Sequence, residues 1–148
     1  MQQWALGCPR PDPAFECESG ATLSIQRLIS VVDDDQPCRE SLRRLLKSLA
    51  FRADVFSSAA DFLASPRLSE TGCLIADIHM PAMTGLELYR HLVASGRTIP
   101  TILVTGYPND ADRARALADG VVCYLRKPID EHDLAQGLRT AFRSDDGA

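Results

Sequence analysis

Apolar residues along this chain gather in short runs that alternate with segments of helical periodicity. Five of these runs are rich in aliphatic and β-branched residues and are too short for helices, so each predicts a strand. The run at 101–105, TILVT, is almost entirely apolar or β-branched, which is typical of a strand covered on both faces. The predicted strands span residues 27–32, 52–56, 72–77, 101–105 and 121–125.

The segments after these runs carry start and stop signals of helices. Pro37 suits a first helical turn, and leucines recur at helical spacing at positions 42, 45, 46 and 49. Ser58 and Asp61 resemble a second helix start, and Asp130 can cap the last helix. Predicted helices span residues 37–49, 58–64, 84–95, 111–119 and 131–142.

The third predicted helix has the strongest local signals. Thr84 and Glu87 form a capping-box pattern, and Gly96 is placed to end the helix. Its predicted inward residues are Leu86, Tyr89, Leu92 and Val93.

The alternation of strands and helices predicts an α/β fold. Short loops and continuous apolar strands favour a parallel sheet with helices on both faces. The 148 residues, 45% of them hydrophobic, suffice for one domain. Residues 1–24 contain three prolines and no sustained period, so we expect a disordered leader, a domain at 25–143 and a flexible tail at 144–148.

Charge and cysteine content exclude several function classes. A net charge of −4 and a pI near 5.3 give no electrostatic basis for direct nucleic-acid binding. No apolar run approaches the roughly 20 residues of a membrane helix, and nothing resembles a signal peptide, so we expect a cytoplasmic protein without membrane contact. The five cysteines are scattered without a C-x-x-C pair, which favours free thiols over a disulfide framework or zinc site.

Polar residues stand where the predicted strands end. Asp33 and Asp34 follow the first strand, Asp77 ends the third, Thr105 ends the fourth and Lys127 follows the fifth. In a parallel sheet these positions meet at one edge, where ligands bind. Carboxylates suit Mg²⁺, Lys127 and Thr105 suit phosphoryl oxygens, and Asp77 is a candidate carboxylate nucleophile. Simpler alternatives exist for three residues. Thr105 could only favour the strand, Lys127 could only be a surface charge, and Asp35, which follows Asp34, could cap the next helix.

Four motifs in this order resemble the receiver domain of two-component response regulators. They are VVDDD at 31–35, IADIHMPAMTG at 75–85, LVTG at 103–106 and KP at 127–128. DDDQPCRESL at 33–42 and IPTILVTG at 99–106 make the chain most similar to receivers of the FixJ type. Any one of these motifs is weak evidence for the family, whereas all four at matching spacing are highly specific for it.

The resemblance implies a flavodoxin-like (βα)5 sandwich, strand order 2-1-3-4-5, and a phosphoryl switch. By position, Asp77 would be the phosphoacceptor, Asp33 and Asp34 would hold Mg²⁺ with Asp77, and the backbone carbonyl of His79 would be a further ligand. Thr105 would bind the phosphoryl group, and Lys127 would pair with it. The resemblance also implies that Tyr124 moves with Thr105, although a fixed core aromatic is an equal alternative, and that the Lys127–Pro128 bond is cis.

At two points the sequence departs from the family pattern in a way that concerns reaction rates rather than the assignment of the family. Ile129 replaces the usual Phe after Lys-Pro, and Tyr107 stands two residues after Thr105. In this family the side chains at the positions of His79 and Tyr107 flank the path of the hydrolytic water. We therefore expect these two side chains to slow self-dephosphorylation.

The resemblance also suggests partners and alternatives. We expect a stand-alone regulator that takes its phosphoryl group from a histidine kinase or phosphotransfer protein and then changes its contacts with a downstream protein or a second copy. The expected surface is the fourth helix, fifth strand and fifth helix, with Arg113, Arg115, Tyr124 and Arg126.

Beyond self-phosphorylation and self-dephosphorylation we expect no enzyme activity. The alternatives are a phosphate-independent module of the same fold and an aspartyl-phosphate phosphatase. The phosphatase is disfavoured because position 79 is His rather than a second Asp. A nucleotide-binding protein is disfavoured because the glycine-rich phosphate motifs are missing from the sequence.

Overall fold

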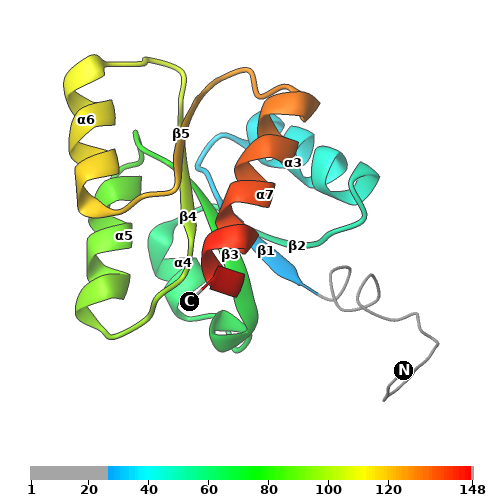
Figure 1. The fold of residues 1–148 in the computed structure, drawn as a ribbon, viewed down its shortest axis with the longest axis horizontal. Coiled ribbons are helices and arrows are strands. Elements are labelled where there is room, and N and C mark those ends of the chain that lie inside the picture. The colour runs from blue at the N-terminus through cyan, green and yellow to red at the C-terminus, as the bar shows by residue number, and fades with distance from the viewer. Residues whose placement is uncertain (1–26, 148) are drawn as a thin grey trace.

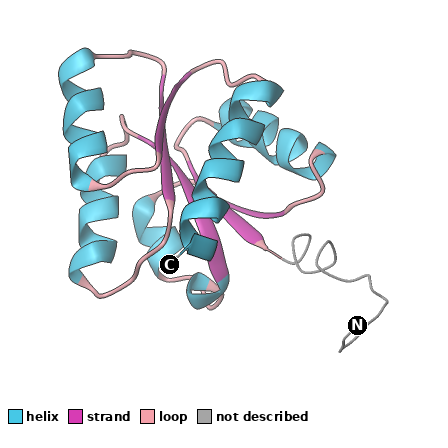
Figure 2. Ribbon diagram, viewed as in Figure 1, coloured by secondary structure: helices cyan, strands magenta, loops and turns pink. Residues whose placement is uncertain are grey.

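A five-stranded parallel sheet forms the centre of the molecule, with strand order β2-β1-β3-β4-β5 (Figure 1). The computed structural model describes the backbone of residues 27–147 and the side chains of residues 27–143. Helices cover both faces of the sheet (Figure 2), which confirms the predicted flavodoxin-like sandwich. The predicted leader at 1–24 and the side chains of the predicted tail lie outside the described residues, but the backbone of residues 144–147 is helical, so the last helix extends past its predicted end at 142.

Element labels follow Figure 1. The strands are β1 (Leu28–Val32), β2 (Arg52–Phe56), β3 (Thr71–Asp77), β4 (Thr101–Thr105) and β5 (Cys123–Arg126). The helices are α3 (Gln36–Ser48), α4 (Ala59–Leu63), α5 (Gly85–Ala94), α6 (Asp110–Asp119) and α7 (Glu131–Gly147), with a short 3-10 turn at Leu68–Glu70 that was not predicted.

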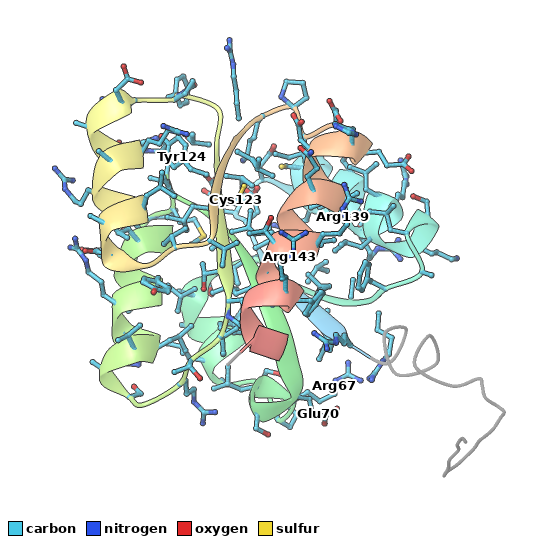
Figure 3. The ribbon with its side chains drawn as sticks, viewed as in Figure 1. Arg67, Glu70, Cys123, Tyr124, Arg139 and Arg143 are labelled. Carbon is cyan, nitrogen blue, oxygen red and sulfur yellow. The ribbon has the colours of Figure 1, made fainter. Side chains whose placement is uncertain are left out.

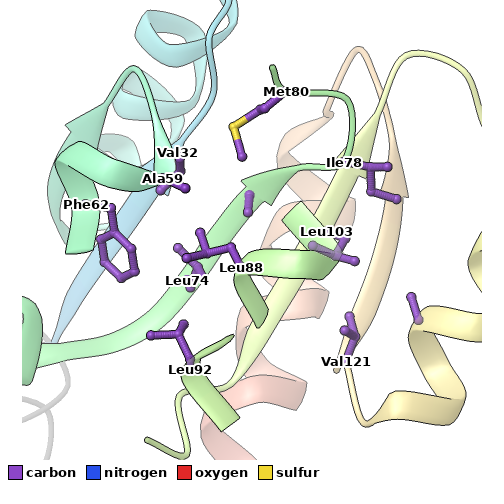
Figure 4. Close-up of a cluster of buried hydrophobic side chains, with 12 residues drawn as sticks. Val32, Ala59, Phe62, Leu74, Ile78, Met80, Leu88, Leu92, Leu103 and Val121 are labelled. Atoms are coloured by element: carbon purple, nitrogen blue, oxygen red, sulfur yellow. The ribbon is translucent and has the colours of Figure 1, made fainter. Parts of the chain in front are cut away.

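Alternate residues of the central strands supply two apolar clusters, one on each side of the sheet. Under α4, α5 and α6, Leu74 and Leu103 pack with residues such as Phe62 and Leu88 (Figure 4). On the opposite side, α3 and α7 cover a cluster that includes Ile75 and Leu138. Because helices cover both faces of the sheet, most residues of the central strands are apolar.

Two sequence predictions about these elements were wrong in detail. On α5, Val93 is 52% exposed and Leu88 is fully buried, so the inward stripe runs through Leu88 and Leu92, with Leu86 and Tyr89 partly buried. The last strand begins at Cys123 rather than Val121, because the Val121 N–H donates to the carbonyl of Ala116 in α6 instead of joining the sheet.

The ends of several helices carry the capping features that the sequence predicted. Gly120 ends α6 with φ of 109°, a left-handed conformation that favours glycine. The capping box at Thr84 and Glu87 is present, and Asp130 accepts from the Asp133 N–H at the start of α7. No helix within the described residues is long and apolar enough to cross a membrane.

Candidate functional site

The sheet brings the predicted site residues to one edge. Asp33 and Asp34 follow β1, and Asp77 is the last residue of β3. Carboxylate oxygens of these three residues lie within 4.8 Å of one another. Asp33 and Asp77 are buried, whereas Asp34 is exposed. The cluster therefore opens to solvent on the side of Asp34.

The turn after β1 is held by backbone and side-chain hydrogen bonds. The Asp33 N–H donates to the Phe56 carbonyl at 3.1 Å, which ties the turn to β2. The Asp35 N–H donates to Asp33 Oδ1 at 2.9 Å, and Arg39 Nη1 donates to the Asp33 carbonyl at 2.7 Å. Asp35 occupies the N-cap position of α3, but its side chain makes no capping hydrogen bond, so the proposed capping role of that carboxylate was wrong.

Lys127 lies between the two buried carboxylates. Its Nζ is 2.8 Å from Asp33 Oδ2 and 3.2 Å from Asp77 Oδ2. The Lys127–Pro128 peptide bond that follows it is cis, as the resemblance implied. The ammonium thus partly neutralises an edge that otherwise carries three negative charges.

The two buried carboxyls have opposite pKa shifts. Burial raises the pKa of Asp77, the negative charge of Asp33 raises it further, and the His79 amide and Lys127 offset only part of this effect. Burial also raises the pKa of Asp33, but hydrogen bonds from Lys127, the Asp35 amide and the Cys38 thiol outweigh it, leaving this pKa lowered. Of the two buried carboxyls, Asp77 is therefore the more readily protonated.

The donor set fits a hard divalent cation. The Asp33, Asp34 and Asp77 carboxylates are close enough to share one ion, and Mg²⁺ prefers oxygen ligands together with retained waters. Asp33 Oδ2 is buried, and apart from its ion pair with Lys127 it has no hydrogen-bond partner among the described residues. Such an under-satisfied carboxylate oxygen is consistent with a cation site.

The turn after Asp77 depends on a glycine. A Cβ atom on Gly85 would lie 2.6 Å from the Asp77 carbonyl oxygen, so α5 can approach the end of β3 this closely only without a side chain there. The His79 N–H donates to Asp77 Oδ1 at 3.1 Å and orients the carboxylate. The role of the His79 carbonyl as a metal ligand stays a prediction.

Thr105 is fully buried at the end of β4, and its hydroxyl accepts a hydrogen bond from the Tyr107 N–H at 2.9 Å. Tyr107 is 78% exposed, and its ring meets the His79 ring edge-on, with centroids 5.8 Å apart. The loops after β3 and β4 are thus in contact through these two aromatic side chains.

Tyr124 extends from β5 toward α6 (Figure 3). The side chain is half-buried, and its hydroxyl accepts a hydrogen bond from the Asn109 N–H at 3.2 Å. Asn109 is the N-cap of α6, so Tyr124 is linked to the start of that helix. Its predicted movement with Thr105 stays a prediction.

Sequence reasoning missed three neighbours of the site. The sequence alone indicated no role in the site for Arg39, Cys38 or Asn109. Arg39 bonds the Asp33 carbonyl and the Cys38 thiol lies against the Asp33 carboxylate, which helps raise the pKa of that thiol to about 12, burial being the larger cause. For Arg39 the only signal was its place in the string DDDQPCRESL at 33–42.

The fold and this edge define a class: a doubly wound α/β domain with acidic residues and a lysine beyond the carboxyl ends of its strands. The family model described as "Response regulator receiver domain" matches residues 29–139, and the chain belongs to that family. Receiver domains are signalling domains that bind Mg²⁺ at an acidic pocket.

Similar proteins agree with this assignment. The response regulator protein TmoT of Ectopseudomonas mendocina is 36% identical over 118 residues, which cover 80% of this chain and 54% of that protein. The transcriptional regulatory protein FixJ of Bradyrhizobium diazoefficiens is 35% identical over 116 residues, or 78% of this chain and 56% of that protein.

Among solved structures, the crystal structure titled FixJ-N matches with a TM-score of 0.72 and 31% identity, covering 78% of this chain and 93% of that one. The chain spans a little over half the length of TmoT and of FixJ.

Proposed function

We propose that this chain is a phosphorylation-controlled signalling domain in which Asp77 accepts a phosphoryl group. The observation that carries the proposal is the arrangement around Asp77: its Oδ2 is 3.2 Å from Lys127 Nζ, and its carboxylate lies with those of Asp33 and Asp34. An incoming phosphoryl group needs a nucleophile and positive charge for its oxygens, and this edge offers both.

In the proposed reaction, a carboxylate oxygen of Asp77 forms a bond to phosphorus while the bond from phosphorus to the donor atom breaks. The donor is a phosphohistidine of a histidine kinase or phosphotransfer protein, and its electron pair leaves with the imidazole nitrogen. Mg²⁺, held by Asp33, Asp34, Asp77 and the carbonyl of His79, would supply additional charge neutralisation. The Lys127 ammonium pairs with a phosphoryl oxygen, and the Thr105 hydroxyl donates a hydrogen bond to another.

The signal would leave the site through Thr105 and Tyr124. Turning the Thr105 hydroxyl toward the phosphoryl group releases its hydrogen bond with the Tyr107 amide and opens space beside β4. Tyr124 then rotates inward and gives up its hydrogen bond with Asn109 at the start of α6. The contact surface changed in this way includes the exposed Arg113, Arg115 and Arg126.

The first test is the intact mass of the protein after incubation with Mg²⁺ and acetyl phosphate. We expect the parent to gain one phosphoryl group, and Asp77→Asn to gain none because the amide is not nucleophilic. Asp34→Asn keeps Asp77 but loses a proposed metal ligand, so its labelling should fall at least tenfold.

The outcomes separate the candidate functions. Equal labelling of the parent and Asp77→Asn would show that another residue is the acceptor. No labelling, under conditions where a control receiver is labelled, would favour the phosphate-independent interaction module. Continuous turnover of small phosphate esters would instead point to a phosphatase, contrary to our proposal that this chain has no activity beyond self-phosphorylation and self-dephosphorylation.

A further inference from the structure

Arg39 makes a contact that the proposed reaction does not use. We infer that Arg39 is a positioning residue for the cation site, acting through the backbone of the turn at Asp33, Asp34 and Asp35. The inference rests on the proposed function, because it concerns the affinity of the same acidic edge for Mg²⁺.

Arg39 reaches back from the first turns of α3 to the turn before the helix. Its Nη1 donates to the Asp33 carbonyl at 2.7 Å, a short bond from a charged donor. The same residue of the turn is fixed at its amide by the Phe56 carbonyl and at its carboxylate by the Asp35 amide. Arg39 therefore supplies the one hydrogen bond, among the described residues, that holds the carbonyl side of Asp33.

Asp34 depends on this turn more than its neighbours do. Its carboxylate is exposed and is engaged by no hydrogen bond or ion pair within the described part of the chain. By contrast, Asp33 is held by Lys127, and Asp77 by Lys127 and the His79 amide. Because no side chain among the described residues holds the Asp34 carboxylate, its place in the cluster depends on the backbone that carries it, and the peptide between Asp33 and Asp34 is the one that Arg39 holds.

Charge and positioning predict opposite results when Arg39 is replaced. A guanidinium near a cation site repels a divalent ion, so its removal would tighten Mg²⁺ binding if charge alone mattered. If Arg39 holds the turn, its removal lets Asp34 leave the other carboxylates and weakens binding. Loss of a group that orients a metal ligand typically costs about 10–100-fold in affinity.

The experiment is a titration of the full chain with MgCl₂, followed by amide chemical shifts. Arg39→Met keeps an apolar stem of similar length but removes the charge and all donors. We expect its Mg²⁺ dissociation constant to rise about tenfold, with metal-free shift changes centred on residues 33–35. Arg39→Lys should recover part of the loss. Arg44→Met is the matched control: it removes a charge from an exposed position of the same helix, and we expect parental or slightly tighter binding.

The results separate this inference from the proposed function. Parental or tighter affinity in Arg39→Met, with the parent binding Mg²⁺, would refute the positioning role and leave the proposed function intact. If the parent itself shows no saturable binding, the proposed cation site is refuted and the inference with it. A loss of urea stability without a change in affinity of the folded protein would reduce Arg39 to a structural contact. Should Arg39→Met fail to fold, Arg39→Gln is subject to the same expectations.

Discussion

Lys127 contacts both buried aspartates, Asp33 and Asp77, but at different distances. It is closer to Asp33 than to Asp77, by 2.8 Å against 3.2 Å, and the pKa of Asp33 is lowered whereas that of Asp77 is raised. Of the two carboxylates, Asp77 is thus the less stabilised in its charged form, and it is the one that we propose as the nucleophile. The pairing also implies that the two carboxyls make opposite contributions to folding stability at neutral pH.

Asp77→Asn should stabilise the metal-free protein at pH 7. A carboxyl whose pKa is raised on folding contributes stability below its unfolded pKa, about 3.9, and that contribution is lost as pH rises through the folded pKa. The neutral amide escapes this loss, so we expect a gain on the order of 1 kcal/mol, which is the usual scale of a single-substitution effect. Urea unfolding in EDTA at pH 7 and pH 3 measures the gain, which should vanish at pH 3.

Asp33→Asn is the matched comparison, with the opposite sign. Its lowered pKa gives the parent stability above the unfolded pKa, which is lost as pH falls through the folded value. The variant should therefore be less stable than the parent at pH 7, by roughly 1–3 kcal/mol, because the Lys127 ammonium loses its nearer partner. If both substitutions changed the stability in the same direction, or if the changes did not depend on pH, the opposite pKa shifts of Asp33 and Asp77 would be contradicted.

At the scale of elements, the loops after β3 and β4 carry the two rings that meet beside the site. His79 belongs to the first loop and Tyr107 to the second, each two residues past its strand end, and their rings are in edge-on contact. The family resemblance implies that the water that hydrolyses an aspartyl phosphate passes between the side chains at these two positions. The ring pair is therefore expected to prolong the phosphorylated state.

Tyr107→Gly should shorten the lifetime of phosphorylated Asp77 several-fold, because it opens the path of water without touching the carboxylates. The decay of the phosphorylated mass over time measures the lifetime. Tyr107→Phe keeps the ring and should retain the parental lifetime. An unchanged lifetime in Tyr107→Gly would remove the shielding role from Tyr107.

The elements show which features could be predicted from the sequence. Strand-terminal residues such as Asp77 and Lys127 were predictable because parallel strands end at one edge, whatever the details of packing. The phase of α5 was not, since Val93 and Leu88 are both apolar and only the neighbouring elements decide which one is covered. The contact of Arg39 with the Asp33 carbonyl was not predictable either, because it depends on how a long side chain folds back over a turn.

At the scale of the whole molecule, α6, β5 and α7 present one continuous surface, on which Arg139 and Arg143 also lie (Figure 3). Phosphorylation is proposed to change this surface through Tyr124. We expect the protein to form dimers when it is treated with Mg²⁺ and beryllofluoride, a phosphoryl mimic. Size-exclusion chromatography with light scattering measures the change, and Asp77→Asn serves as the control. Identical elution with and without the mimic would count against phosphorylation-driven dimerisation.

Helix α6 buries little of its surface against the rest of the domain, and this has a consequence for how such proteins diversify. Ala116 is the one residue of this helix that is fully covered, and the hydroxyls of Tyr89 and Tyr124 bond backbone groups at its two ends. Most of its remaining side chains face solvent and can be exchanged without disturbing either apolar cluster. If α6 belongs to the contact surface, as we propose, the residues that choose a partner are largely separate from those that fold the domain, so a gene duplicate can acquire a new partner through changes in this helix while its fold stays intact.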